Sequence, residues 1–193
     1  GGFVQRRCRE PIGMDSTSFG PTVEMVGRMA TPYRKDKATG ELVAAGNSRF
    51  SEPLADRRRT AIPAGGLFST AEDLTQLYQM ILLGGELDGR RYLKAETLRL
   101  MATNQLGDLP KVSFAPGMHM GLGFHVVHAP QGVTESLSAG TFGHGGAYGT
   151  QAWIDPVRRR AYILLIQRTD LPNSDGSEIR RIFQQTAQEY FGR

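Results

Sequence analysis

The sequence predicts an α+β protein in which helices come first and an antiparallel sheet follows. Apolar residues recur at helical spacing in the first half of the chain. From residue 120 onward, short β-prone segments are separated by Gly, Pro, Asp and Arg, and an amphipathic segment closes the chain. Because the two kinds of element are segregated rather than alternating, we expect an antiparallel sheet with a covering C-terminal helix.

The chain is expected to begin in a helix and then to leave regular structure. Residues 3–10 are typical of the last turns of a helix, which Pro11 and Gly13 would end. Residues 27–60 are polar and rich in Gly and Arg, which predicts a long loop. Such long loops are uncommon inside a compact domain and are often functional.

A clearly delimited helix is predicted from Ser69 to the glycine pair at 84–85. Ser69 would be its N-cap residue, and Glu72 would complete a capping box. The apolar stripe that follows consists of Leu74, Leu77, Tyr78, Ile81 and Leu82. A turn at Asp88-Gly89 then leads to a second predicted helix over residues 94–104.

The second half of the chain predicts four short strands and a covering helix. The strands are residues 121–127, 141–146, 150–155 and 161–167. The segment DPVRRR connects the last two as an antiparallel hairpin, and the unbroken apolar run AYILLI predicts burial on both faces. The stripe expected to be buried on the final helix is Ile179, Ile182, Phe183, Ala187 and Tyr190.

Composition and charge exclude several classes of partner. Apolar residues make up 39% of the chain and charged residues 22%, as in an ordinary globular protein. The net charge of +4 includes the runs Arg57-Arg58-Arg59 and Arg158-Arg159-Arg160, but neither is interleaved with aromatic residues, so no nucleic-acid partner is expected. The longest apolar run, residues 161–166, is too short for a membrane span. Cys8 is alone, so no internal disulfide is expected.

Three histidines, His119, His125 and His128, lie close together in the sequence and raise the question of a metal site. On a strand, residues 125 and 128 would point to opposite faces. No carboxylate lies near them in the sequence, and the ligand spacing of a metal site is not met. We therefore expect surface or packing histidines, with neither a bound metal nor a cofactor.

The stretch GTFGHGGAYGTQAWIDP, residues 140–156, places a histidine between glycines just before a predicted strand. A purely structural histidine in a turn is one interpretation, and it stays open here. The letters HGGA also occur in the oxyanion loop of α/β-hydrolase lipases. That fold requires a G-x-S-x-G elbow, which is absent from this sequence, and a strand rather than a helix follows the motif here.

Three segments in order carry a resemblance to a known family. They are EPIGMDSTSF, PAGGLFSTAEDLTQLYQMILLGGELDGRRYLKAETLRLMATNQ, and GLGF followed by GHGGAYGTQAWIDP. Together they resemble the serine beta-lactamase and penicillin-binding-protein-like hydrolases, in particular the branch of class C beta-lactamases, D-alanyl-D-alanine carboxypeptidases and carboxylesterases. The resemblance implies the C-terminal part of the beta-lactamase/transpeptidase-like fold. Residues 1–119 would belong to the helical subdomain and residues 120–193 to the α/β subdomain, with the N-terminal part of the fold absent.

In that family three motifs build the site: S-x-x-K with the nucleophilic serine, Y-x-N or S-x-N, and K-T-G or H-x-G. His144-Gly145-Gly146 match the third motif. The resemblance implies that His144 faces the substrate carboxylate or joins the proton network, and that Gly146 lets a ligand approach the strand. The Ala147 amide would be an oxyanion-hole donor. Gly145 and Tyr148 would contact the substrate, although aromatic packing is an equal alternative for Tyr148.

The first two motifs are absent from these 193 residues. No serine is followed by a lysine three positions later, and neither Y-x-N nor S-x-N occurs. In the family both motifs precede the segment that EPIGMDSTSF resembles, so we expect the C-terminal part of a longer enzyme. The missing N-terminal segment, or a second copy of the chain, would pair with the open edge of residues 161–167. The resemblance also implies a periplasmic or secreted location.

Two functional hypotheses follow. In the first, the intact protein is a serine hydrolase that forms an acyl-enzyme on a small-molecule amide or ester, as a carboxypeptidase, esterase or beta-lactamase. This chain alone would then be inactive, because it carries the H-x-G motif without the nucleophile. In the second, the chain is a non-catalytic ligand-binding or assembly module derived from the same fold.

Overall fold

The computed structural model describes residues 2–46, 54–56, 60–63, 65–107, 109, 116–171 and 175–192. The chain forms two compact units. One consists of Gly1–Leu77 with Ile166–Asp170, and the other of Tyr78–Leu165 with Leu171–Arg193. Helices and antiparallel sheet both occur, and the predicted α+β class is confirmed. The subdomain division at residue 120 stays a prediction.

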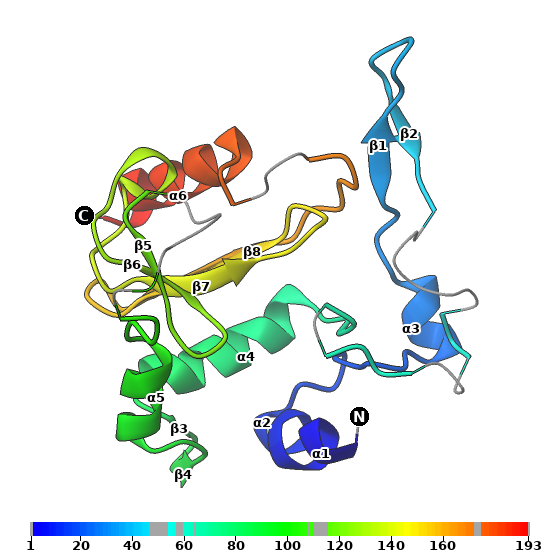
Figure 1. Cartoon of the computed structure of the whole chain (residues 1–193). Helices are drawn as coiled ribbons and strands as arrows, with labels where there is room; N and C mark the ends of the chain where they lie inside the picture. The colour runs from blue at the N-terminus through cyan, green and yellow to red at the C-terminus, as the bar shows by residue number, and fades with distance from the viewer. Residues whose placement is uncertain are drawn as a thin grey trace. The chain divides into compact units, whose positions relative to one another are not determined.

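The elements are short, and the main sheet is formed late in the chain (Figure 1). The helical elements are α1 (Gly2–Val4), the π-helical η1 (Gln5–Arg9), α2 (Glu10–Ile12), α3 (Val23–Gly27), α4 (Ala71–Leu82), α5 (Ala95–Met101), the 3-10 turn η2 (Gly132–Thr134) and α6 (Glu178–Phe191). The strands are β1 (Tyr33–Lys35), β2 (Leu42–Ala44), β3 (Glu86–Leu87), β4 (Arg90–Arg91), β5 (Met118–Met120), β6 (His125–Val127), β7 (Phe142–Gly145), β8 (Gln151–Asp155) and β9 (Arg160–Leu164). Among the described helices, none is both long and apolar enough to cross a membrane.

The first unit begins with the continuous helical stretch α1, η1 and α2. Gly13, with a φ of 80°, ends this stretch in the left-handed conformation that helix C-termini commonly use. Gly13 ends the helix as predicted, but Pro11 does not, because it lies inside α2.

The described part of residues 27–60 is not a loop throughout, because β1 and β2 form an antiparallel hairpin there. The Asp36 carboxylate accepts two backbone amides of the hairpin turn, at 2.9 and 3.0 Å. Short polar side chains stabilise turns in this way, which explains how a polar segment can still form a hairpin. Residues 47–53 and 57–59, with the Arg57-Arg58-Arg59 run, lie outside the described residues.

The predicted amphipathic helix is present as α4, but its cap is one residue later than predicted. The Thr70 hydroxyl accepts the Asp73 amide at 3.2 Å. The Ser69 hydroxyl lies 2.7 Å from the Thr17 hydroxyl, and Thr17 donates to the buried Asp73 carboxylate at 2.6 Å. The expected capping box of Ser69 and Glu72 is therefore wrong, because the Ser69 hydroxyl is engaged with another segment of the chain.

The predicted helix end, turn and second helix that follow α4 are all confirmed. Gly84 and Gly85 have positive φ values and close the helix, and the Gly85 amide donates to the Met80 carbonyl at 2.9 Å. Asp88 and Gly89, with φ of 50° and 73°, form the two-residue turn between β3 and β4. The second predicted helix is present as α5.

Five antiparallel strands, in the order β5-β6-β7-β8-β9, form the sheet of the second unit. The predicted strand 121–127 is wrong in its first half, because the chain turns between β5 and β6. Gly123 has a φ of 77°, and a side chain at Gly121 would meet the Met101 carbonyl, so both positions require glycine. The other three predicted strands are confirmed as β7, β8 and β9.

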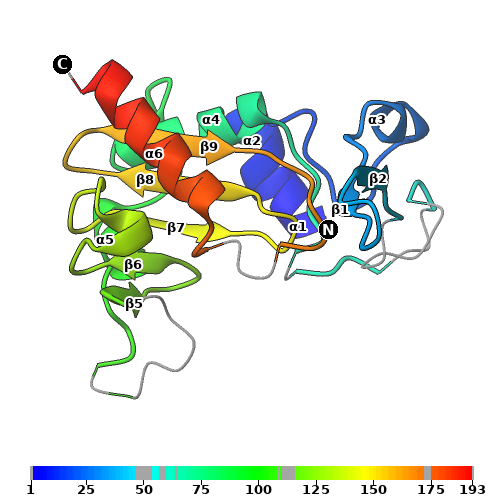
Figure 2. The ribbon, with the colours of Figure 1, turned by 90° about the horizontal axis from the view of Figure 1, so that it is seen from above.

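β9 lies at the edge of this sheet, and among the described strands it pairs with β8 alone. Tyr162 is buried, whereas Ala161 is exposed, and Leu165 just after the strand is 41% exposed. The prediction that AYILLI is buried on both faces is therefore wrong. α6 crosses one face of β8 and β9 (Figure 2), which accounts for the burial of Tyr162.

The core of the second unit lies between the sheet and α6. Its buried residues are Met118, Val127, Leu137, Trp153 and Tyr162, against which the partly buried Phe183 and Ala187 of α6 pack. Trp153 is completely buried and is the largest side chain in this core. Burial of these apolar surfaces is the main force that holds α6 on the sheet.

The buried face of α6 differs from the prediction. Arg180 and Gln184 are buried, with Arg180 only 1% exposed. The expected members of the buried stripe that are exposed instead are Ile179, Ile182 and Tyr190. The guanidinium of Arg180 lies 3.8 Å from the centre of the Trp153 ring, and this cation–π contact turns a polar side chain inward.

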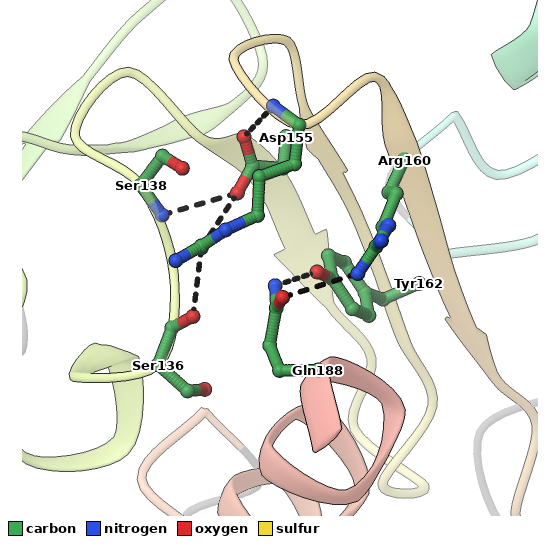
Figure 3. Close-up of polar contacts among 7 residues, drawn as sticks. Ser136, Ser138, Asp155, Arg160, Tyr162 and Gln188 are labelled. Carbon is green, nitrogen blue, oxygen red and sulfur yellow. Dashed lines mark hydrogen bonds and ion pairs between the residues drawn. The ribbon is translucent and has the colours of Figure 1, made fainter. Parts of the chain in front are cut away.

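A buried carboxylate, Asp155, closes the hairpin between β8 and β9 (Figure 3). It accepts the amides of Ser138 and Arg158 at 3.1 and 2.9 Å, and the Arg158 guanidinium lies 3.3 Å away. Burial by itself would raise the pKa of Asp155, but these partners outweigh it, and the pKa lies below its ordinary value. Arg160 donates to Gln188 of α6 at 3.2 Å, so two members of the second arginine run have structural contacts.

Candidate active site

The five residues predicted for the site lie together at the end of β7 and in the turn that follows. In the pairing of β7 with β8, His144 is opposite Ala152, and Gly145 is opposite Gln151. The His144 side chain is exposed, and its Nδ1 lies 2.6 Å from the Gly145 carbonyl oxygen. The remaining predicted residues, up to Tyr148, continue directly into the turn.

This turn leaves a backbone amide without an acceptor. The Gly146 amide donates to the Thr150 carbonyl at 2.7 Å, and the Gly149 amide donates to the Gly146 carbonyl at 3.0 Å. Within the described part of the chain, the Ala147 amide has no hydrogen-bond acceptor, and Ala147 is exposed. A backbone amide held in this way can stabilise a negatively charged oxygen without reorganisation.

Neighbouring side chains closely approach both glycines of the motif. A side chain at Gly145 would meet the Asp175 carboxylate, and one at Gly146 would meet the Thr150 hydroxyl. Tyr148 is half-buried, and its phenol oxygen is buried without a hydrogen-bond partner among the described residues. The backbone conformation of the motif is therefore fixed by the packing around it.

His125 of β6 contacts His144 directly. The two imidazole rings are stacked, with centroids 4.7 Å apart and planes 24° from parallel. His125 Nδ1 lies 4.0 Å from Asp175 Oδ2. Burial lowers the pKa of His125, and the charges of His144 and Arg180 lower it further, whereas Asp175 acts in the opposite direction.

A chain of polar contacts connects the motif strand to the start of α6. The Trp153 indole donates to Gln151 at 2.7 Å, and the Gln151 amide donates to the Asp175 carboxylate at 3.2 Å. Arg180 donates to the Asp175 backbone carbonyl at 2.7 Å while its guanidinium lies on the Trp153 ring. Burial lowers the pKa of Arg180 to about 10, so the side chain is still a cation at neutral pH. This cation lies in the same cluster as His125.

Sequence reasoning missed His125, Gln151, Asp175 and Arg180 as neighbours of the motif. The strand register could have indicated His125, since β6 places it opposite Gly143, one residue before His144. No local pattern marks the other three residues, because Asp175 and Arg180 contact the strand residues Gln151 and Trp153 only when α6 packs on the sheet.

The other two histidines of the sequence cluster form a second stacked pair. His119 and His128 stack on each other, with ring centroids 4.3 Å apart. Among the described residues, no group of three or more His, Cys, Asp and Glu side chains is placed to hold a metal ion.

Comparison with known proteins identifies the family. A family model described as Beta-lactamase matches residues 1–187 of the chain. The chain belongs to the beta-lactamase family. The resemblance predicted from its three sequence segments is thereby confirmed.

Two proteins of Mycobacterium tuberculosis are among the relatives of the chain. Protein Rv1367c is 32% identical over 174 residues, which cover 86% of this chain and 42% of that protein. The esterase/beta-lactamase LipL is 32% identical over 116 residues, which cover 60% of this chain and 25% of LipL. The chain thus spans less than half the length of these relatives.

Solved structures also share the fold of this chain. A mutant of simvastatin synthase, LovD from Aspergillus terreus, matches with a TM-score of 0.73 and 17% identity, covering 96% of this chain and 47% of LovD. At that identity the likeness shows the fold alone. Together with the family model, this likeness confirms the predicted beta-lactamase/transpeptidase-like fold.

Proposed function

We propose that this chain supplies one wall of the active site of a serine hydrolase that forms an acyl-enzyme on a small-molecule amide or ester. The observation that carries the proposal is the unpaired Ala147 amide beside the exposed His144 at the end of β7. Family membership supports a hydrolase of the beta-lactamase superfamily. The name of the relative LipL, an esterase/beta-lactamase, supports acyl transfer in particular.

The proposed roles follow from the chemistry of acyl transfer. Attack on a carbonyl places negative charge on one oxygen, and the Ala147 amide would be a donor of the oxyanion hole. His144 would contact the substrate or join the proton network, and Gly145 and Tyr148 would line the substrate position. Lactams, peptides and esters all require this same chemistry. The proposed substrate class is therefore an amide or ester with an acyl group that can be transferred to a serine.

The nucleophile is proposed to lie outside these 193 residues, because no S-x-x-K occurs in them. Incubation of this chain with a fluorescent penicillin and with an activated ester should therefore give no covalent label. A longer polypeptide that includes an S-x-x-K segment should be labelled under the same conditions. Covalent labelling of the 193-residue chain alone would refute this placement of the serine.

The role of His144 is tested in the labelled, longer polypeptide. His144→Ala should lower kcat/KM for ester hydrolysis by about 10²-fold or more if the imidazole takes part in proton transfer. His128→Ala is the matched control, since His128 stacks on His119 rather than on His144. Equal activities of the two variants would exclude a role for His144.

Assembly is the second candidate function, and the open edge of β9 favours it. We propose that a further polypeptide segment pairs with β9 and covers the exposed apolar residues of α6. These residues are Ile179, Ile182, Tyr190 and Phe191. Unpaired edges and exposed apolar patches are common sites of association. The segment that carries the serine is the proposed occupant, with a second copy of the chain as the alternative.

Sedimentation velocity over a range of concentrations tests this proposal. The isolated chain should self-associate, and Ile182→Lys should shift it toward monomer because the lysine places a charge on the apolar face. Val157→Lys is the control, since Val157 is 70% exposed but belongs to the turn between β8 and β9, outside both α6 and the edge strand β9. A monomer at high concentration that also binds no serine-bearing segment would contradict the proposal.

A further inference from the structure

His125 occupies a position that the H-x-G motif does not account for. It comes from a neighbouring strand, β6, yet its ring is stacked on that of His144 at 4.7 Å. Its side chain is only 15% exposed, whereas His144 is exposed. One face of the exposed imidazole is therefore covered by a second, mostly buried imidazole.

Asp175 lies beside the ring of His125, and its carboxylate and its backbone are each held by a hydrogen bond. Gln151 donates to Oδ1 at 3.2 Å, while Oδ2 lies 4.0 Å from His125 Nδ1. Arg180 anchors the backbone of Asp175 through the carbonyl at 2.7 Å. The carboxylate is thereby directed at the His125 ring.

We propose that His125 is a positioning residue for His144, and that a positive charge on either of the two stacked rings disfavours a charge on the other. The proposal rests on the proposed function, since it assigns His125 to the support of a site residue in acyl transfer. Asp175 orients the His125 ring, and His125 in turn limits the movement of the His144 ring.

This coupling follows from the groups that face His125. His144 faces it from β7, Asp175 from the turn before α6, and Arg180 from α6. Two positive charges on stacked rings would repel each other, and the Arg180 cation adds to that repulsion. Asp175 offsets part of it, but burial opposes a charge on His125, and the net effect is a pKa of His125 below its ordinary value.

Proton NMR titration of the histidine ring signals in the 193-residue chain tests the coupling without any need for catalysis. His144→Ala should move the titration midpoint of His125 to higher pH, because a repelling charge is removed. Asp175→Asn should move the same midpoint to lower pH, because an attracting charge is removed. His128→Ala is the control and should leave the midpoint of His125 unchanged. A His125 midpoint that responds to neither Asp175→Asn nor His144→Ala overturns the proposal.

Two substitutions of His125 separate positioning from a merely structural role. His125→Phe keeps a flat ring for stacking but cannot titrate, whereas His125→Ala removes the ring. In a longer polypeptide with hydrolytic activity, His125→Ala should lower kcat on the order of tenfold with little change in KM, since misplaced groups affect the chemical step. His125→Phe should restore most of kcat but alter the pH profile of kcat. An identical pH profile and kcat in the wild type and in both variants overturns the positioning role.

The two proposals fail in different ways. If the longer polypeptide does not hydrolyse acyl compounds, the proposed function fails while the NMR coupling between His125 and His144 still stands. If hydrolysis requires His144 but the coupling is absent, the proposed function stands and the role of His125 is refuted.

Discussion

The carboxylate of Asp175 occupies the space that a side chain at Gly145 would need. Asp175 belongs to the turn before α6, so residues far apart in sequence determine which amino acid can stand in the middle of the motif. Gly145 is required by this packing, whatever role it has toward a substrate.

Gly145→Ala should therefore destabilise the second unit by about 1 to 3 kcal/mol, the usual cost of inserting a methyl group where no space exists. Urea unfolding followed by Trp153 fluorescence measures the change, since Trp153 is the only tryptophan of the chain and is buried in that unit. Gly20→Ala is the control, because a side chain there would meet no atom within 4 Å. Adding Asp175→Gly to Gly145→Ala should recover part of the loss, and no recovery would contradict the stated cause.

Asp155 should make the second unit less stable in acid. Its pKa is below the ordinary value in the folded chain, so its contribution is present above about pH 4, the unfolded value, and is lost as pH falls through the folded pKa. Asp155→Asn should reduce the free energy of unfolding at pH 7 by about 2 to 3 kcal/mol and flatten this acid dependence. Thermal unfolding between pH 3 and pH 7 checks it, with the exposed Glu189→Gln as control.

Tyr78 should make the protein less stable in alkali. Burial raises the pKa of Tyr78 to about 12, whereas an unfolded tyrosine ionises near 10. Above pH 10 the unfolded chain loses this proton and the folded chain keeps it, so stability falls between about pH 10 and pH 12. Tyr78→Phe should reduce that fall, as measured by urea unfolding at several alkaline pH values. A wild-type curve and a Tyr78→Phe curve of equal slope would contradict the burial effect.

The cap of α4 gives a test that separates the structure from the sequence pattern. Thr70→Ala should destabilise α4 by about 1 kcal/mol, because the Asp73 amide loses its side-chain acceptor. Glu72→Ala should have little effect, since the capping box predicted for Ser69 and Glu72 is not formed. Circular dichroism during thermal unfolding compares the two variants, and a larger loss for Glu72→Ala would favour the original pattern.

Local signals of the sequence were sufficient for most elements. Glycines with positive φ marked the ends of helices and the Asp88-Gly89 turn, because few other residues adopt that backbone conformation. Helical periodicity located α4 and α5, and the strands β7 to β9 were marked by the Gly and Pro residues around them. The motif residues were found because they are contiguous.

Contacts between distant segments explain what the sequence could not provide. Apolar spacing predicted that Ile182 of α6 is buried, but the Trp153 ring attracts the Arg180 cation and turns a different face inward. In the same way, Ser69 was a good cap by pattern and was instead engaged by Thr17. Among the neighbours of His144, only His125 could have been indicated by strand register, because the positions of Asp175 and Arg180 depend on the docking of α6.

Through the contacts of Arg180 with Trp153 and Asp175, the last helix supports the surroundings of the histidine pair. A chain shortened before Glu178 would retain all residues of the motif. It would lose the hydrogen bond from Arg180 to the Asp175 carbonyl and the guanidinium that covers the Trp153 ring. Deletions or fusions at the carboxyl end are thus expected to change the conformation of the site residues at the end of β7.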